Sequence, residues 1–129
     1  MSAGARVRLH HVQVGCPRGG EDAARVFYAR VLGIPEVAKP PVLAARGGCW
    51  FRGDAVEVHV GVEDPFTPAA KAHPGFVVDD VDAVAAGVAT AGFPVRWDDD
   101  FPGYRRFYTR DGNGNRVEVL GRTGAPTEA

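Results

Sequence analysis

The sequence predicts an α+β fold in which one β-α-β-β-β module occurs twice in tandem. Three pairs of landmarks recur at nearly one offset: His11 and His73 are 62 residues apart, residues 33–35 (GIP) and 92–94 (GFP) are 59 apart, and residues 56–58 (VEV) and 117–119 (VEV) are 61 apart. A chain of 129 residues has the size of one domain. We therefore expect a single domain with module one at about 7–62, a linker at 63–72, module two at about 73–120 and a tail at 121–129. The two modules would form curved mixed sheets around a concave cup, with the helices on the convex outer face.

Module one begins with a strand at residues 7–14, where side chains alternate between two faces. Glu21 and Asp22 begin a helix, because acidic residues suit its positive N-terminal end, and Gly33 followed by Pro35 ends it. Three strands are predicted after this helix, at about residues 42–46, 49–52 and 55–62.

Module two repeats this order. A strand begins at His73, and Asp79 or Asp80 caps a helix that runs to about Ala91. Further strands are predicted at residues 95–97, 105–109 and 116–120. Residues 111–115 (DGNGN) form a tight turn before the last strand.

Composition limits the partners of the chain. The formal net charge of −1 gives no electrostatic reason to expect nucleic acid or an anionic membrane. No run is apolar and long enough to span a bilayer, and the N-terminus lacks the apolar core of a signal peptide. Cys16 and Cys49 have no CxxC spacing and are interpreted as reduced, partly buried thiols. We therefore expect a cytoplasmic protein that binds neither nucleic acid nor a membrane.

Polar side chains gather on the face of each predicted sheet that lies opposite the apolar face. They come from the first and last strands of the two modules: His11, Gln13, Glu57, His59, His73 and Glu118. An imidazole or carboxylate on a concave surface is costly unless it is paired, hydrated or bound to a metal. Imidazoles and carboxylates on neighbouring strands suit a divalent transition metal such as Zn, Ni, Mn or Fe, with positions left open for a substrate.

Several motifs resemble those of the vicinal oxygen chelate superfamily, which includes glyoxalase I, fosfomycin-resistance thiol transferases, extradiol dioxygenases and bleomycin-resistance proteins. They are residues 9–14 (LHHVQV), 27–33 (FYARVLG) and 111–118 (DGNGNRVE). The resemblance covers residues 7–120 and is specific to the superfamily, not to one activity in it. Family members usually have proline where this chain has Gly112, a change that the turn should tolerate.

The resemblance implies a set of metal ligands on the first and last strands of each module: His11, Glu57, His73 and Glu118. His59 lies two residues after Glu57 on the same face and is an alternative fourth ligand. The duplication offset favours Glu57, whereas the affinity of imidazole for transition metals favours His59. The resemblance further implies a homodimer in which each site draws ligands from both chains.

The chemistry implied is a metal-dependent lyase, isomerase or thiol-transferase reaction of glyoxalase type on an oxygen-rich substrate. Glu57 or Glu118 would be the catalytic base, and four residues are candidates for substrate binding: Gln13, Trp50, Arg106 and Tyr108. Two alternatives stay open. One is a drug-sequestering protein of the bleomycin-resistance type, which uses no metal. The other is an extradiol-type dioxygenase with His11, His73 and Glu118 as its iron ligands.

Overall fold

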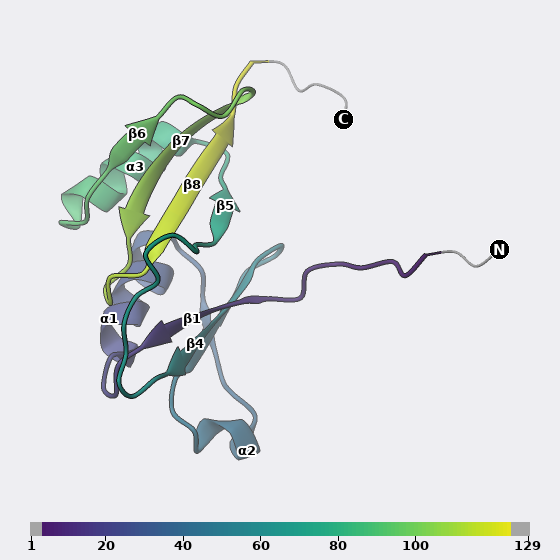
Figure 1. Ribbon diagram of the computed structural model, residues 1–129, viewed down its shortest axis with the longest axis vertical. Helices are drawn as coiled ribbons and strands as arrows, with labels where there is room; N and C mark the ends of the chain where they lie inside the picture. The colour runs from purple at the N-terminus through teal and green to yellow at the C-terminus, as the bar shows by residue number, and fades with distance from the viewer. Residues whose placement is uncertain (1–3, 125–129) are drawn as a thin grey trace.

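The computed structural model describes residues 4–124, which form two four-stranded mixed sheets flanked by helices (Figure 1). The first sheet has the strand order β1-β4-β3-β2 and the second has the order β5-β8-β7-β6. In each sheet the first strand of the module runs parallel to the last, and the other neighbours are antiparallel. The predicted α+β class and the tandem modules are confirmed, and the two sheets do not close on each other.

The first module consists of β1 (Val12–Cys16), α1 (Glu21–Arg25), the π-helix η1 (Val26–Val31), β2 (Glu36–Val37), α2 (Pro41–Ala44), β3 (Cys49–Arg52) and β4 (Glu57–Val62). The helix predicted from Glu21 is therefore confirmed, although its second half widens into π-helical turns. It ends at Gly33, whose φ of +75° is a conformation that glycine adopts without steric cost.

Two predictions for this module are wrong. Residues 42–46 were expected to form a strand, but Pro41–Ala44 is a short helix. Pro41 stands in its first turn, where the missing N–H of proline is not needed. The first strand begins at Val12 and not at residue 7, because Val12 pairs with Val58 next to the start of β4. Residues preceding β1 extend from the body, with Val7 86% and Leu9 85% exposed (Figure 1).

The second module follows the predicted order. It consists of β5 (Gly75–Val77), α3 (Val81–Thr90), β6 (Arg96–Asp98), β7 (Tyr104–Arg110) and β8 (Arg116–Arg122). The cap of α3 is Asp80, whose Oδ1 accepts a hydrogen bond of 3.0 Å from the N–H of Ala83. Strand β8 runs two residues past its predicted end at 120. Residues 125–129 of the predicted tail lie outside the described residues.

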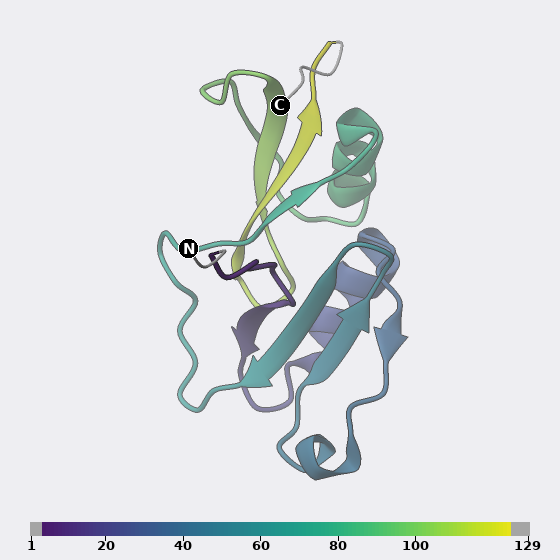
Figure 2. The same ribbon diagram turned by 90° about the vertical axis from the view of Figure 1, so that its right-hand side faces the viewer.

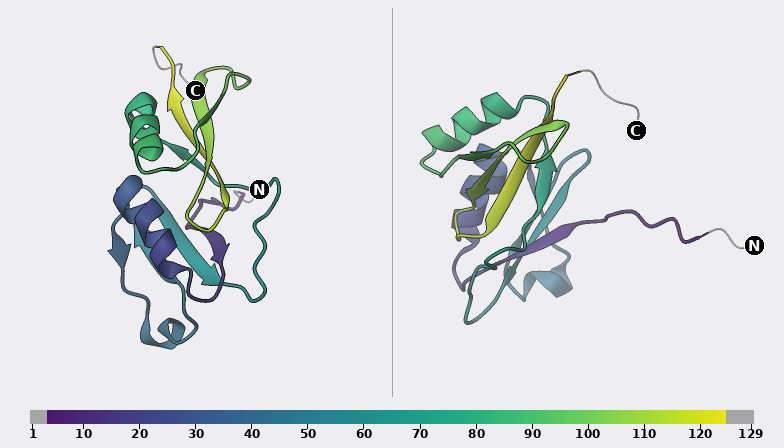
Figure 3. Two further views of the ribbon diagram at one scale, coloured as in Figure 1. Left: turned by 90° about the vertical axis from the view of Figure 1, so that its left-hand side faces the viewer. Right: turned by 45° about the horizontal axis from the view of Figure 1, so that its top comes forward.

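One apolar core joins the two modules. The helices α1 and α3 lie on the same side of the sheets (Figure 2 and Figure 3). Phe27, Phe51 and Phe107 are fully buried, and each such side chain contributes about 1.5–3 kcal/mol of transfer free energy. Phe27 also meets Phe93 of module two edge to face at 5.2 Å. Within residues 4–124, no helix has the length and apolar character needed to cross a membrane.

Polar side chains of the turn before β8 form hydrogen bonds between module two and module one. Asp111 accepts a hydrogen bond of 2.7 Å from the hydroxyl of Tyr28, which is fully buried. Asn115 Nδ2 donates to the carbonyl of Gly15 at 2.7 Å, and Asn113 Nδ2 donates to the carbonyl of Gly20 at 3.0 Å. We call Asp111, Asn113 and Asn115 the module staple. The sequence predicted a turn here, and the structure adds that its side chains fix how the modules meet.

Candidate functional site

The pairing of strands shows which residues of the two modules occupy equivalent positions. In module one, His59 of β4 lies between Gln13 of β1 and Trp50 of β3. In module two, Glu118 of β8 lies between Gly75 of β5 and Tyr108 of β7. His59 and Glu118 are therefore counterparts, and so are Trp50 and Tyr108.

The first strands obey the same relation. His11 stands two residues before Gln13, and His73 stands two residues before Gly75. Each module thus brings a histidine that precedes its first strand against a side chain of its last strand. We call the pair His11 and His59 half-site one, and the pair His73 and Glu118 half-site two.

Half-site one is a stack of flat rings. The imidazole of His59 is only 6% exposed and lies between the rings of Trp50 and His11. The ring centres are 3.9 Å apart for Trp50 and 3.8 Å apart for His11, and the ring planes are inclined by 4° and 16°. Burial lowers the pKa of His59, although the neighbouring carboxylate of Glu57 opposes this. A buried neutral imidazole with one nitrogen lone pair available is a typical metal ligand.

Glu57 orients His59. Its Oε2 lies 2.8 Å from Nε2 of His59, and its Oε1 accepts a hydrogen bond of 3.0 Å from Nε of Arg52. The hydrogen bonds from Arg52 and then from His59 lower the pKa of Glu57 to about 2, so this carboxylate can only accept. Nε2 of His59 therefore carries the proton and Nδ1 carries the lone pair. A carboxylate that holds the N–H of a histidine in this way commonly supports a metal ligand.

Half-site two brings two acceptor atoms together. Nδ1 of His73 lies 2.7 Å from the carbonyl oxygen of Lys71, so Nδ1 carries a hydrogen. Nε2 of the same ring lies 2.9 Å from Oε1 of Glu118. Two acceptors this close repel each other unless a cation lies between them, and a metal ion can take that place. Two neighbouring ligands of one ion, each about 2.1 Å from it, are separated by about 3 Å at a right angle and by about 3.4 Å at the tetrahedral angle.

Arg106 completes the environment of Glu118. Its Nη1 donates to Oε2 of Glu118 at 2.8 Å, while Nη2 binds Oδ1 of Asp98 at 3.0 Å. Burial raises the pKa of Glu118, but the hydrogen bonds from Arg106 and His73 outweigh it, so the pKa lies below its ordinary value. Tyr108 meets His73 edge to face at 5.3 Å. Arg106 thus forms salt bridges to both Asp98 and Glu118.

The remaining predicted residues occupy the same sheet faces. Gln13 is exposed, and its amide lies across Gly61, at which an added Cβ would lie 2.7 Å from Nε2 of Gln13. Trp50 stacks on His59 as described. Among residues 4–124, no group of three or more His, Cys, Asp or Glu side chains of one chain is placed to hold a metal ion. Each half-site supplies two of the candidate ligands.

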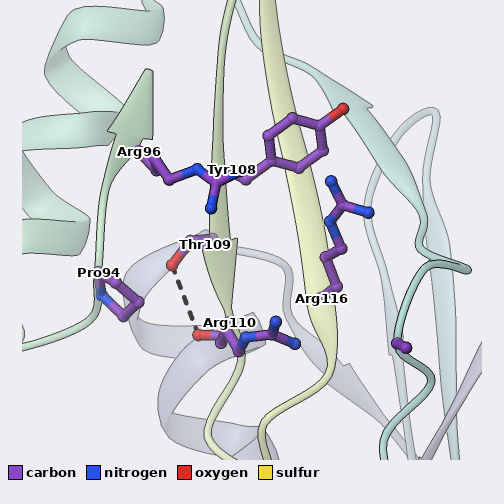
Figure 4. A pocket seen from close by; sticks show the side chains of 7 residues that line it. Pro94, Arg96, Tyr108, Thr109, Arg110 and Arg116 are labelled. Atoms are coloured by element: carbon purple, nitrogen blue, oxygen red, sulfur yellow. Dashed lines mark hydrogen bonds between the residues drawn. The ribbon is translucent and has the colours of Figure 1, made fainter. Parts of the chain in front are cut away.

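The sequence analysis did not predict the contact between Glu57 and His59 or the group of arginines beside half-site two. Alternation places Glu57 and His59 on one face, and only the pairing with Trp50 distinguishes them. Arg96, Arg110 and Arg116 line a hollow on the second sheet (Figure 4). The signal available in the sequence was the excess of arginine over acid in residues 104–110 and 116–122.

The fold and the paired half-sites define a class of protein built from two β-α-β-β-β modules. A crystal structure of a protein from Bacillus anthracis, assigned to the glyoxalase family, shares 39% identity with this chain and superposes with a TM-score of 0.89. The match covers 95% of this chain and 100% of the other. The chain therefore belongs to the glyoxalase family of the vicinal oxygen chelate superfamily.

Two further structures share the fold at lower identity. A glyoxalase/dioxygenase from Nostoc punctiforme is 19% identical with a TM-score of 0.77, over 96% of this chain and 97% of the other. TnmS3, an antibiotic binding protein from Streptomyces sp. CB03234, is 21% identical with a TM-score of 0.69, over 92% and 100%. The chain matches no protein-family model and no curated protein.

Proposed function

We propose that the protein is a metal-dependent enzyme of glyoxalase type, whose ion is held by His11, His59, His73 and Glu118. The observation that carries this proposal is the acceptor pair of half-site two, where Nε2 of His73 and Oε1 of Glu118 lie 2.9 Å apart. Three imidazoles and one carboxylate form a donor set that suits Zn, Ni, Mn or Fe. Glu57 is assigned the orientation of His59 and not a ligand position.

The two half-sites belong to one centre only if two copies of the chain pair. A single chain gathers fewer than three donors at any point of residues 4–124. A symmetric dimer can bring half-site one of one copy to half-site two of the other, which produces two identical centres. The exposed apolar side chains of Val7 and Leu9, on the segment that leaves the body, support a partner surface nearby.

The chain's own residues would then do the following. The ion, when bound, supplies Lewis acidity to two adjacent oxygens of a small substrate. Glu118 is held in its ionised form by Arg106, so it is able to accept a proton from a carbon next to a substrate carbonyl and to return it. Trp50 and Tyr108, which occupy equivalent positions in the two modules, would enclose the substrate between flat rings. Cys16 and Cys49 are both buried free thiols, which favours a reducing compartment such as the cytoplasm.

Metal titration tests the ligand set. Chelator-treated protein should bind about one ion per chain in calorimetric titrations with Zn, Ni, Mn and Fe(II). His59→Ala and Glu118→Ala should each lose at least about a hundredfold in affinity, and Glu57→Gln should lose about 10–100-fold, as expected for a residue that orients a ligand. Asp99→Ala, an exposed carboxylate on the loop after β6, is the control. If Glu57→Ala and Glu57→Gln both lost metal binding completely, Glu57 would be a ligand instead.

Complementation tests the shared centre. His11→Ala removes a ligand from half-site one, and Glu118→Ala removes a ligand from half-site two. When the two variants are mixed, unfolded and refolded together, mixed dimers contain one intact centre, so about a quarter of all centres should bind metal again. A centre built within one chain would show no recovery.

A specific observation also favours the alternative of ligand sequestration. His73 and Glu118 are polar partners of each other, His59 has Glu57 as its partner, and Trp50 and Tyr108 offer ring surfaces for a flat molecule. Metal-free protein that binds aromatic antibiotics, with affinity lost in Trp50→Ala and kept in His11→Ala, would support this alternative. Oxygen consumption with catechols and Fe(II) would support the dioxygenase.

A further inference from the structure

A hollow of about 370 Å3 lies on the second sheet beside half-site two, and arginines form its walls (Figure 4). Arg96 comes from β6, Tyr108 and Arg110 come from β7, and Arg116 comes from β8. Arg96 pairs with Tyr108, and Arg110 pairs with Arg116, so all four side chains emerge from one face of the sheet.

The three guanidinium groups have no carboxylate partner among residues 4–124. Arg110 donates to the carbonyl of Gly114 at 3.2 Å, and Arg116 donates to that of Lys71 at 3.4 Å. Arg116 also lies over the ring of Tyr108, 4.2 Å from its centre. Arg110 and Arg116 thus contact only carbonyls and a ring, whereas Arg96 lies near enough to Asp98 for their charges to interact. Arg106 on the same face differs, since it binds both Asp98 and Glu118.

This arrangement works against the stability of the sheet. Arg110 and Arg116 stand directly opposite each other in the antiparallel ladder, where like charges destabilise the pairing. A local conflict of this kind is expected where a residue serves binding. Three guanidinium groups around one hollow offer positive charge to an oxyanion, a group that arginine binds through paired hydrogen bonds.

We propose that this hollow binds a phosphoryl or carboxylate group of the same ligand whose oxygen pair is held at half-site two. The inference rests on the proposed function, because it assigns the second end of that ligand. Tyr108 joins the two places, since its ring contacts both His73 and Arg116. Arg116 and Glu118 are two residues apart on β8, which corresponds to about 7 Å. The ligand is therefore a short molecule with an oxygen pair at one end and an oxyanion at the other. Three guanidinium groups that form no salt bridge favour a phosphoryl dianion over a single carboxylate.

Anion titration of chelator-treated protein tests the hollow without the metal. Inorganic phosphate and acetate are titrated at constant ionic strength, because screening would otherwise obscure the comparison. Phosphate should bind wild type, and Arg96→Gln or Arg110→Gln should weaken it about tenfold or more. Arg30→Gln removes one charge from an exposed position of η1 and should change nothing. Stronger binding of phosphate than of acetate assigns a phosphoryl group, and the reverse order assigns a carboxylate.

Two further measurements separate the possible failures. Arg110→Gln should unfold at the same temperature as wild type or at a higher one, since it relieves the repulsion with Arg116, and it should keep its metal affinity. Equal phosphate affinity of wild type, Arg96→Gln, Arg110→Gln and Arg30→Gln would overturn the inference, whatever the metal titration shows. If wild type bound no metal but the phosphate affinities followed the predicted pattern, the proposed function would be overturned and the oxyanion site would be supported.

Discussion

Replacement of Asp111 by alanine should cost a large part of the stability of the protein. The carboxylate is 4% exposed and accepts four hydrogen bonds: from the hydroxyl of Tyr28 at 2.7 Å, from Asn115 Nδ2 at 2.9 Å, from the backbone of Asn113 at 2.8 Å and from the backbone of Asn115 at 3.0 Å. Tyr28 and Asn115 are buried, so their donors cannot turn to water.

The magnitude follows from these two buried donors. A hydrogen bond to a charged group contributes about 1.5–3 kcal/mol, so the loss of two such bonds costs about 3–6 kcal/mol. The free energy of unfolding of a domain is about 5–15 kcal/mol, so Asp111→Ala should be close to unfolding. Tyr28→Phe removes one of the two bonds, and the double-mutant cycle should give a coupling of about 1.5–3 kcal/mol.

Urea denaturation followed by tryptophan fluorescence measures these values. The protein concentration is kept fixed, because subunit association would change the apparent stability. Asp99→Ala removes an exposed carboxylate and should stay within about 0.5 kcal/mol of wild type. A coupling below about 0.5 kcal/mol between Asp111 and Tyr28 would refute the view that the module staple holds the modules together.

Two other changes test the contacts around α1. The N–H of Gly48 donates to Glu21 at 2.8 Å and lowers the pKa of that carboxyl below its ordinary value of 4.5. Its stabilising effect is thus present above about pH 4.5 and is lost as pH falls through the lower folded pKa. Melting temperatures from pH 6 to about pH 3 should fall more steeply for wild type than for Glu21→Gln; parallel curves would contradict this. Gly112→Ala should destabilise by about 1–3 kcal/mol in urea, because the new Cβ would lie 2.4 Å from the carbonyl oxygen of Ala23. Gly87→Ala, an exposed position of α3 with no atom within 4 Å of the new Cβ, should be neutral or stabilising.

The duplication in the sequence was sufficient to predict the fold class, the order of most elements and the face on which polar residues gather. It failed at residues 42–46, where β-prone valine and leucine follow two prolines. The chain there forms the helix α2, because Pro41 suits a first helical turn and only β2, two residues long, completes the sheet. Local propensity does not encode whether a strand has a neighbour to pair with.

The candidate site shows the same limit more sharply. Side chains two residues apart in a strand lie on the same face. Alternation therefore allows either Glu57 or His59 as the counterpart of Glu118 and does not choose between them. The offset of 61 residues between the two VEV segments favours Glu57, but the ladders pair His59 with Trp50 and Glu118 with Tyr108. Offset and pairing differ by two residues because the loops of the two modules have unequal lengths. A comparison by sequence offset alone does not correct for these lengths. Register is set between strands, by partners far away in the chain. The residue that we propose as a metal ligand, His59, is therefore distinguished by its pairing with Trp50, whereas Glu57 contacts it from two positions away on the same strand.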